Sequence, residues 1–192
     1  LYTNNQILTN ILKIEAYQAD LSFAQERLWF IEQYEQGTSA YHLPEVYELD
    51  VHTDLDGIKY AIQQIVSRHE VLRSTIEVVN QGHGIQSVHQ EPLFIEHVIL
   101  TDESDYWTLL KEDILRPFDL QVSYPIRVKF YTIQSSAESG KSAPSRTILL
   151  INLHHIASDG WSSGIFRREL WAYYQAYVSE EVDCSLSPLD IQ

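Results

Sequence analysis

The segment from Thr147 to Leu153 limits the possible folds of this 192-residue chain more strongly than any other stretch. It reads Thr-Ile-Leu-Leu-Ile-Asn-Leu, so apolar residues follow one another almost without polar alternation. A short continuous apolar run is typical of a strand that is covered on both faces, as in the sheet of an α/β protein. We therefore expect this segment to be a strand inside a sheet that is flanked by helices.

Helical and extended patterns alternate along the rest of the chain. Apolar residues at helical spacing, with Ser22 and Gln25 forming a capping box, predict helices over 22–34, 54–72, 104–116 and 162–178. The apolar positions expected to face the core are Ala24, Leu28, Ile31 and Tyr34 in the first helix and Trp107, Leu110 and Ile114 in the third. Strands are expected at 46–51, 75–79, 85–89, 93–100 and 126–133, with a glycine-bearing turn at 80–84 and an exposed loop at 135–146. Since no repeat or linker interrupts this alternation, we expect a single α/β domain over residues 1–192, with a mixed central sheet flanked by helices.

Charge and composition narrow the classes of partner. The formal net charge is −14, from 13 basic and 27 acidic side chains, which repels phosphate backbones and anionic lipid. No apolar stretch approaches the ~20 residues that span a bilayer, and the first residues lack the features of a signal peptide. The single cysteine, Cys184, excludes an internal disulfide framework. We therefore expect a cytoplasmic protein without a nucleic-acid or membrane partner.

The buried strand runs into the sequence Leu-His-His-Ile-Ala-Ser-Asp-Gly-Trp-Ser, residues 153–162, and then into a helix. Reactive groups concentrate at such strand ends, because the strand fixes a side chain while the loop leaves it accessible. On a strand His154 and His155 point to opposite faces, so at most one meets a substrate and the other needs a hydrogen-bond partner in the packing. Asp159 could accept from backbone N–H groups of the turn or pair with an arginine, and Gly160 allows a close backbone approach or a positive φ.

Simpler structural roles account for the same residues. Both histidines could be satisfied core or edge residues, with Asp159 acting only as a helix cap. Opposed side-chain directions disfavour a metal ion held by the two histidines, so no metal site is expected. The remaining candidates also have structural interpretations. Arg68 and His69 lie near the end of the second expected helix, where the helix macrodipole favours basic residues. Arg27 could lie on a solvated helix face, and Trp29 could lie in the core.

Three ordered motifs together resemble the condensation domains of nonribosomal peptide synthetases. The first spans 22–29 and includes Ser22, Gln25, Arg27 and Trp29; the second spans 68–73 and includes Arg68, His69 and Arg73; the third is His154–Gly160 with Trp161 and Ser162. Residues 39–44 and 116–120 are similar to weaker family stretches. The segment 187–192 looks like the approach to the family's fourth motif, and later motifs are absent. The resemblance thus identifies an N-terminal lobe whose C-terminal lobe is missing.

The resemblance implies a chloramphenicol acetyltransferase-like fold of two lobes with a tunnel between them. Donor and acceptor peptidyl carrier proteins load this tunnel through 4′-phosphopantetheine arms, and no cofactor is bound intrinsically. The resemblance implies that the acceptor α-amine attacks the donor thioester and forms an amide. The residues of the first motif are similar to those of subtypes that take an L-configured donor. His155 is then the catalytic residue, supported by His154, Gly160 and a structural Asp159 that pairs with an arginine of the other lobe.

Elementary chemistry limits what His155 can contribute. A free α-amine has a pKa of ~8, so its deprotonation at neutral pH costs only ~1 kcal/mol. After attack, however, the intermediate carries an acidic ammonium, and an imidazole is well matched to take that proton. The N–H groups around Gly160 at the helix start could stabilise the oxyanion, and Trp161 and Ser162 are assigned to substrate binding.

Two other functions stay open. One is a related acyltransferase that forms esters or uses coenzyme A, and the other is a non-catalytic scaffold on which carriers dock. Because the tunnel needs both lobes, the fragment alone is expected to be inactive. Its partners are then the carriers, the missing lobe and the neighbouring synthetase domains.

Overall fold

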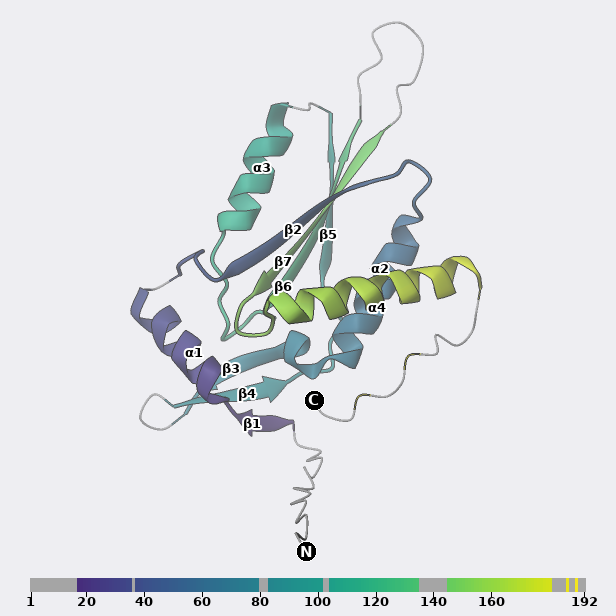
Figure 1. Cartoon of the computed structure of the whole chain (residues 1–192). Helices are drawn as coiled ribbons and strands as arrows, with labels where there is room; N and C mark the ends of the chain where they lie inside the picture. The colour runs from purple at the N-terminus through teal and green to yellow at the C-terminus, as the bar shows by residue number, and fades with distance from the viewer. Residues whose placement is uncertain are drawn as a thin grey trace, which may run out of the picture.

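A computed structural model describes residues 17–35, 37–79, 83–101, 104–134, 145–180, 186 and 189. Its larger sheet has four strands in the order β2 (His42–Leu49), β7 (Arg146–His154), β6 (Ile126–Ile133) and β5 (Ile95–Leu100) (Figure 1). β5 pairs with β6 in parallel, and the other pairs are antiparallel, so the sheet is mixed. The apolar run 147–153 forms β7, inside the sheet, which confirms the central-strand prediction.

Helices cover both faces of this sheet. α2 (Leu55–Arg68) and α4 (Gly160–Val178) pack on one face, where β7 contributes Leu149, Ile151 and Leu153 to the core. α3 (Ser104–Leu115) packs on the other face over Ile148 and Leu150 of the same strand. Alternate side chains of β7 thus enter two separate cores, which explains why its sequence is apolar without alternation. The α/β class and the chloramphenicol acetyltransferase-like lobe expected from the resemblance are confirmed.

A second, three-stranded antiparallel sheet lies beside the first motif. Its order is β1 (Gln18–Asp20), β4 (Gly84–Val88) and β3 (Ser74–Val78), and α1 (Phe23–Glu35) follows β1 directly (Figure 1). A small core of mostly aliphatic side chains joins α1 to β3 and to the loop after β7: Leu21, Trp29, Ile76, Phe118, Leu120 and Ile156. The predicted pairing of β3 with β4 is confirmed. The turn residues 80–82 and most of the loop 135–146 lie outside the described residues.

Several local predictions were wrong. Ala24 and Tyr34 of α1 are exposed, and the helix instead buries Trp29 and Glu32. Trp107 of α3 is also exposed, because the adjacent Tyr106 faces the sheet in its place. The second helix ends at Arg68 and is followed by a 3₁₀ turn, η1 (Glu70–Arg73).

In strand β6 the polar residues Lys129 and Tyr131 alternate with the apolar residues Val128 and Phe130. Lys129 and Tyr131 are buried like their apolar neighbours, because both contact the carboxylate of Asp113 on α3. The Lys129 Nζ and Tyr131 hydroxyl each lie 2.7 Å from an Asp113 oxygen. An ion pair under α3 therefore lets a lysine occupy a buried position.

Side-chain caps fix the starts of three helices. The capping box is present, since Ser22 N–H donates to Gln25 Oε1 at 2.9 Å and Gln25 N–H donates to Ser22 Oγ at 3.3 Å. Asp54 and Asp159 cap α2 and α4 in the same way through backbone N–H groups. Among the helices described, none has the length and apolar character needed to cross a bilayer.

Candidate functional site

The third motif spans the end of β7, a tight turn and the start of α4. Its backbone is fixed on both sides of His155: His154 N–H donates to the Pro125 carbonyl at 2.9 Å, and His155 N–H donates to the Tyr41 carbonyl at 2.8 Å. Ala157 N–H then returns to the His154 carbonyl at 3.0 Å, which closes a β-turn with His155 at its first corner.

The two histidines point to opposite sides, as the strand geometry predicts. His154 has no exposed surface, whereas His155 is exposed. Burial, with smaller contributions from His42 and His155, lowers the pKa of His154 to about 4, so this imidazole is neutral at neutral pH. His155 is therefore the histidine of the pair that a substrate can reach.

The buried histidine was expected to need a hydrogen-bond partner, and this partner is Glu32 of α1. Its Oε1 lies 3.1 Å from His154 Nε2, across 122 residues of sequence. On the other side of the ring, His154 Nδ1 accepts from Ile156 N–H at 3.1 Å. The first motif helix and the third motif are thus joined through one imidazole.

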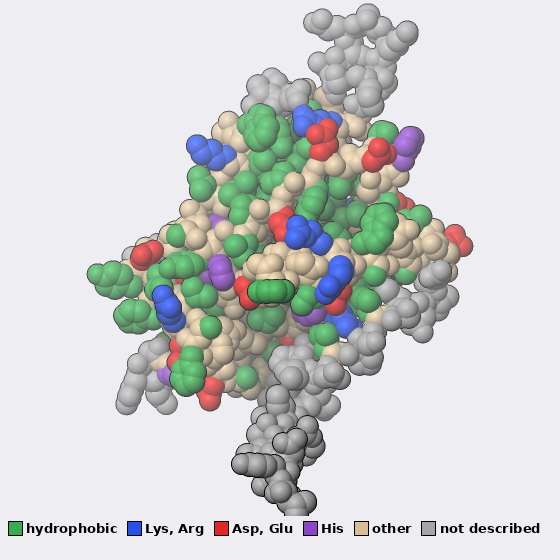
Figure 2. Space-filling model, in the orientation of Figure 1, with side chains coloured by type: hydrophobic (Ala, Val, Ile, Leu, Met, Phe, Trp, Pro, Cys, Tyr) green, Lys and Arg blue, Asp and Glu red, His purple; other side chains and the backbone are tan. Residues whose placement is uncertain are grey.

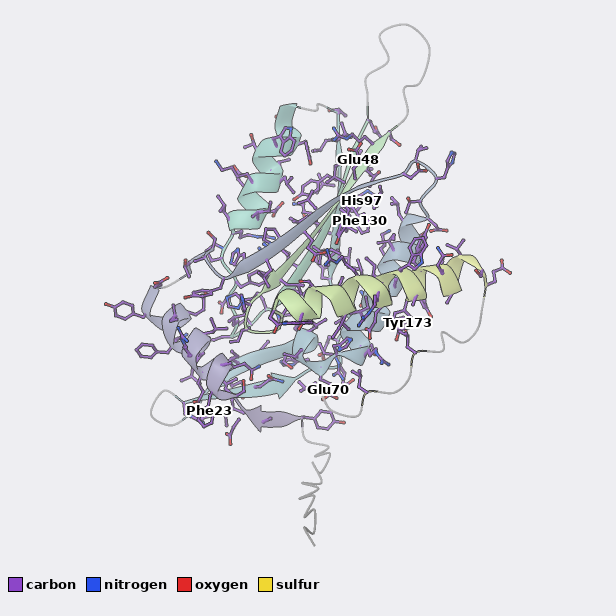
Figure 3. The ribbon with its side chains drawn as sticks, in the orientation of Figure 1. Phe23, Glu48, Glu70, His97, Phe130 and Tyr173 are labelled. Carbon is purple, nitrogen blue, oxygen red and sulfur yellow. The ribbon has the colours of Figure 1, made fainter. Side chains whose placement is uncertain are left out.

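An open groove of about 1130 Å³ lies in front of His155. Its wall includes Ala24, Leu28 and Ile31 of α1, which are the positions that helical spacing had assigned to the core. The groove is also lined by polar residues from the three motifs and their neighbours: Ser22, Gln25, Arg27, Glu70, Asp159 and Ser162. Glu70 marks the η1 side of the groove in Figure 3. Leu28 also packs against the small core, so the apolar face of α1 is shared between the groove and that core.

Asp159 acts as the N-cap of α4. Its Oδ1 accepts from Trp161 N–H at 3.1 Å, from Ser162 N–H at 2.8 Å and from Ser162 Oγ at 2.7 Å. These bonds, first that from the Ser162 backbone, lower the pKa of Asp159. Asp159 therefore accepts hydrogen bonds from backbone N–H groups of the turn, which is one of the two roles expected for it.

One expectation at the start of α4 is wrong, and another stays a prediction. Gly160 has no positive φ, and a Cβ placed on it would meet nothing within 4 Å, so neither strain nor close approach calls for glycine in the described structure. The N–H groups of Trp161 and Ser162 donate to Asp159, and an oxyanion contact by the Gly160 region stays a prediction. Ser162 lines the groove, whereas Trp161 has 89% of its surface exposed.

The second motif joins α2 to α4. Arg68 Nε and His69 Nε2 lie 3.0 and 2.6 Å from the two carboxylate oxygens of Glu169 on α4. On the same helix Tyr173, labelled in Figure 3, joins the core shared with α2. Arg73 donates to the carbonyl of His89 and lies 3.3 Å from Glu70. Arg68 and His69 thus hold α4, and with it the loop that carries His155, in place, whereas Arg73 connects η1 to the residue that follows β4.

Three contributors to the site were missed from the sequence: Glu32, Glu169 and Tyr41. Each acts through a partner more than 100 residues away. Tyr41 lies in the stretch 39–44 that is similar to the family, but no local pattern marks its contact with His155. A signal existed only for Glu32, since the buried histidine was expected to need a partner. In the part of the chain that the structure describes, no group of three or more His, Cys, Asp or Glu side chains is placed to hold a metal ion.

Comparison with known proteins gives a consistent result. The family model described as "Condensation domain" matches residues 15–186. The chain is 36% identical over 179 residues to one of the linear gramicidin synthase proteins of Brevibacillus parabrevis, covering 90% of this chain and 2% of that protein. It is also 36% identical over 173 residues to bassianolide nonribosomal cyclodepsipeptide synthetase of Beauveria bassiana, covering 89% of this chain and 5% of that protein. The chain thus spans only a few per cent of the length of these relatives.

Solved structures share the fold. The X-domain from teicoplanin biosynthesis, in complex with OxyB, is 25% identical with a TM-score of 0.77, and the match covers 94% of this chain and 37% of that chain. The first condensation domain of the calcium-dependent antibiotic synthetase, in complex with a substrate analogue, is 18% identical with a TM-score of 0.72, covering 91% of this chain and 41% of that chain.

Proposed function

Because this chain belongs to the condensation-domain family of nonribosomal peptide synthetases, we propose that it is the N-terminal lobe of a domain that forms amide bonds. The acceptor α-amine, held on one carrier protein, attacks the donor acyl thioester held on another. The acyl–sulfur bond breaks, the amide bond forms and the thiol of the donor arm leaves. The exposure of His155 in the groove, beside a buried neutral His154, is the observation that carries this proposal.

His155 takes the proton that the amine loses during the reaction. Attack places a positive charge on nitrogen, and the resulting ammonium is far more acidic than the free amine. An imidazole in the groove accepts this proton, and afterwards the departing thiolate can be reprotonated. General-base help of this kind is typically worth ~10²–10⁴-fold in rate.

Carrier proteins with 4′-phosphopantetheine arms are the proposed partners, together with a second lobe that closes the groove into a tunnel. The openness of the groove toward solvent supports a missing wall, and the solved relatives are more than twice as long as the region that matches this chain. We therefore place residues 1–192 in one lobe, and we expect this lobe alone to bind without turning over. An L-configured donor is proposed from the wording of the first motif.

The test is a condensation assay in the complete protein that contains this chain, with donor and acceptor carriers loaded. His155→Ala should slow amide formation by ~10²–10⁴-fold and leave carrier binding unchanged. His52→Ala, an exposed histidine before α2, is the matched control and should behave as wild type. Normal turnover by His155→Ala would refute the proposed role.

Ester formation is a second candidate, because one relative is named a cyclodepsipeptide synthetase and a depsipeptide contains ester as well as amide bonds. A hydroxyl is a weaker nucleophile than an amine and needs the base during attack. His155→Ala should therefore reduce transfer to a hydroxyacyl acceptor more than transfer to an aminoacyl acceptor. Comparing the two acceptors in the wild-type protein decides between the candidates.

A further inference from the structure

We propose that Glu32 is a positioning residue for the reaction: its carboxylate fixes the tautomer of His154, and His154 in turn holds the turn that presents His155. This inference rests on the proposed role of His155. Its structural part, the control of the turn by Glu32, can be measured without any turnover.

His154 makes hydrogen bonds on both sides of its neighbour His155. Its main-chain carbonyl accepts from Ala157 N–H, and its ring Nδ1 accepts from Ile156 N–H at 3.1 Å. Both bonds start at residue 154 and end beyond residue 155. The backbone of His155 is therefore enclosed between a main-chain and a side-chain bond made by the residue before it.

The hydrogen bonds of the His154 ring also determine its tautomer. A ring nitrogen that accepts from a backbone N–H must carry a lone pair, so Nδ1 is unprotonated when it receives Ile156 N–H. A neutral imidazole then carries its proton on Nε2, which must donate. Glu32 Oε1, 3.1 Å away, is an acceptor suited to this proton, because a carboxylate only accepts.

Both partners, Glu32 and His154, are buried. Glu32 is 7% exposed and His154 is fully buried, so a missing partner could not be replaced freely by water. Burial, and after it the nearby Glu35, raises the pKa of Glu32, which indicates that the protein keeps this carboxylate in an unfavourable setting. The outer face of the same helix is exposed and aromatic at Phe23, Phe30 and Tyr34, and hydrophobic side chains gather on that side in Figure 2.

The surroundings of the ring leave little alternative room. His42, opposite His154 in the β2–β7 register, is itself held by the Ile114 carbonyl, 2.7 Å from its Nδ1. The Phe118 ring packs on His154 with centroids 5.7 Å apart. If Nε2 lost its acceptor, the proton would move to Nδ1, and the bond from Ile156 N–H would be lost.

The experiment compares Glu32→Ala and Glu32→Gln in the complete protein with loaded carriers. Glu32→Ala should lower kcat by about 10–100-fold with KM for each carrier little changed, because a misplaced His155 affects the reaction rather than docking. Hydrogen exchange of the Ile156 amide should become about tenfold faster, as expected for the loss of one hydrogen bond. Glu32→Gln keeps an acceptor oxygen and should restore both quantities.

Two controls separate positioning from general destabilisation. Gln33→Ala removes an exposed, uncharged polar side chain from the same helix and should change neither quantity. Leu110→Ala destabilises the separate core under α3, on the other face of the sheet, and should leave kcat per folded molecule and Ile156 exchange as in wild type. If Glu32→Ala does not fold, Glu32→Leu fills the same space without an acceptor and takes its place.

The proposal is overturned if Ile156 exchange and kcat are unchanged in a folded Glu32→Ala or Glu32→Leu variant, or if Leu110→Ala lowers kcat to the same extent. A wild-type protein that forms no amide would refute the proposed function instead. In that case the exchange of Ile156 still decides whether Glu32 controls the turn.

Discussion

Replacing Glu169 tests how the second motif supports the site. This carboxylate is 6% exposed, and its two oxygens contact Arg68 at 3.0 Å and His69 at 2.6 Å. Glu169→Leu removes both contacts and leaves Arg68 in a partly buried position without this partner. The link between α2 and α4 should weaken, and the start of α4 should loosen with it.

The magnitude follows from burial. Removing one partner of a fully buried ion pair costs ~3–5 kcal/mol. Because the side chains of Arg68 and His69 are 16% and 21% exposed, water compensates part of the loss, and we expect about 2–4 kcal/mol. For a unit of this size that corresponds to a melting temperature lower by about 4–16 °C.

The assay is thermal unfolding of the complete protein, with hydrogen exchange in α2 and α4 locating the weakened region. Asp56→Asn, which removes the exposed Asp56–Lys59 pair, is the control and should not shift the transition measurably. A folded Glu169→Leu variant with unchanged stability and unchanged α4 exchange would refute the reasoning.

Three further variants test other parts of the site. Trp29→Ala should destabilise the small core by ~3–5 kcal/mol in urea unfolding, because the indole is 6% exposed, and a loss below about 1 kcal/mol would contradict its core position. Asp159→Ala should lower the melting temperature, whereas Asp159→Asn should largely retain it because Asn also caps helices. Because the pKa of Asp159 is lowered in the fold, its contribution to stability should be lost as pH falls through that pKa. An equal loss of stability in both variants would argue against capping. His154, with a pKa lowered from 6.5 to about 4, stays neutral in the fold while the unfolded chain is protonated, so stability should fall by up to about 3 kcal/mol between pH 6.5 and about 4 and stay level above that range. His154→Gln should flatten this dependence, and an unchanged slope would assign it to other groups.

Strand β7 and the histidine pair show what local sequence is able to predict. Continuous apolar residues predicted a strand covered on both faces, because each face of β7 meets a different helical layer. The two-residue period of a strand then separated His154 from His155 before any contact was known. Both inferences depend only on neighbours in the chain.

Helix α1 shows where such reasoning fails. Helical spacing assigned Ala24, Leu28, Ile31 and Tyr34 to the core. The first three line a groove, and Tyr34 is exposed. The polar residue Glu32, which this pattern left out, is buried. Periodicity detects apolar surface without distinguishing a core from a wall that awaits another partner. A buried glutamate is stabilised by a histidine 122 residues away, which no window of sequence contains.

Strand β1 and the ion pairs of Glu169 could not be predicted from the sequence for similar reasons. β1 has three residues, all exposed, and depends on β4 for its existence. The Arg68–Glu169 contact spans 101 residues and forms only after both helices have packed. Macrodipole arguments placed a basic residue at the end of α2 without indicating which acid it would meet.

We propose that this lobe, completed by its partner lobe, transfers a donor acyl group to an acceptor amine with the help of His155. The most direct measurement is the intact mass of the acceptor carrier after a single turnover of the complete protein with loaded carriers. Our account predicts that this carrier gains the mass of the donor acyl group as an amide, and that His155→Ala reduces the initial rate by ~10²–10⁴-fold. An acceptor carrier that gains no acyl mass, or gains it equally fast without His155, would contradict the account.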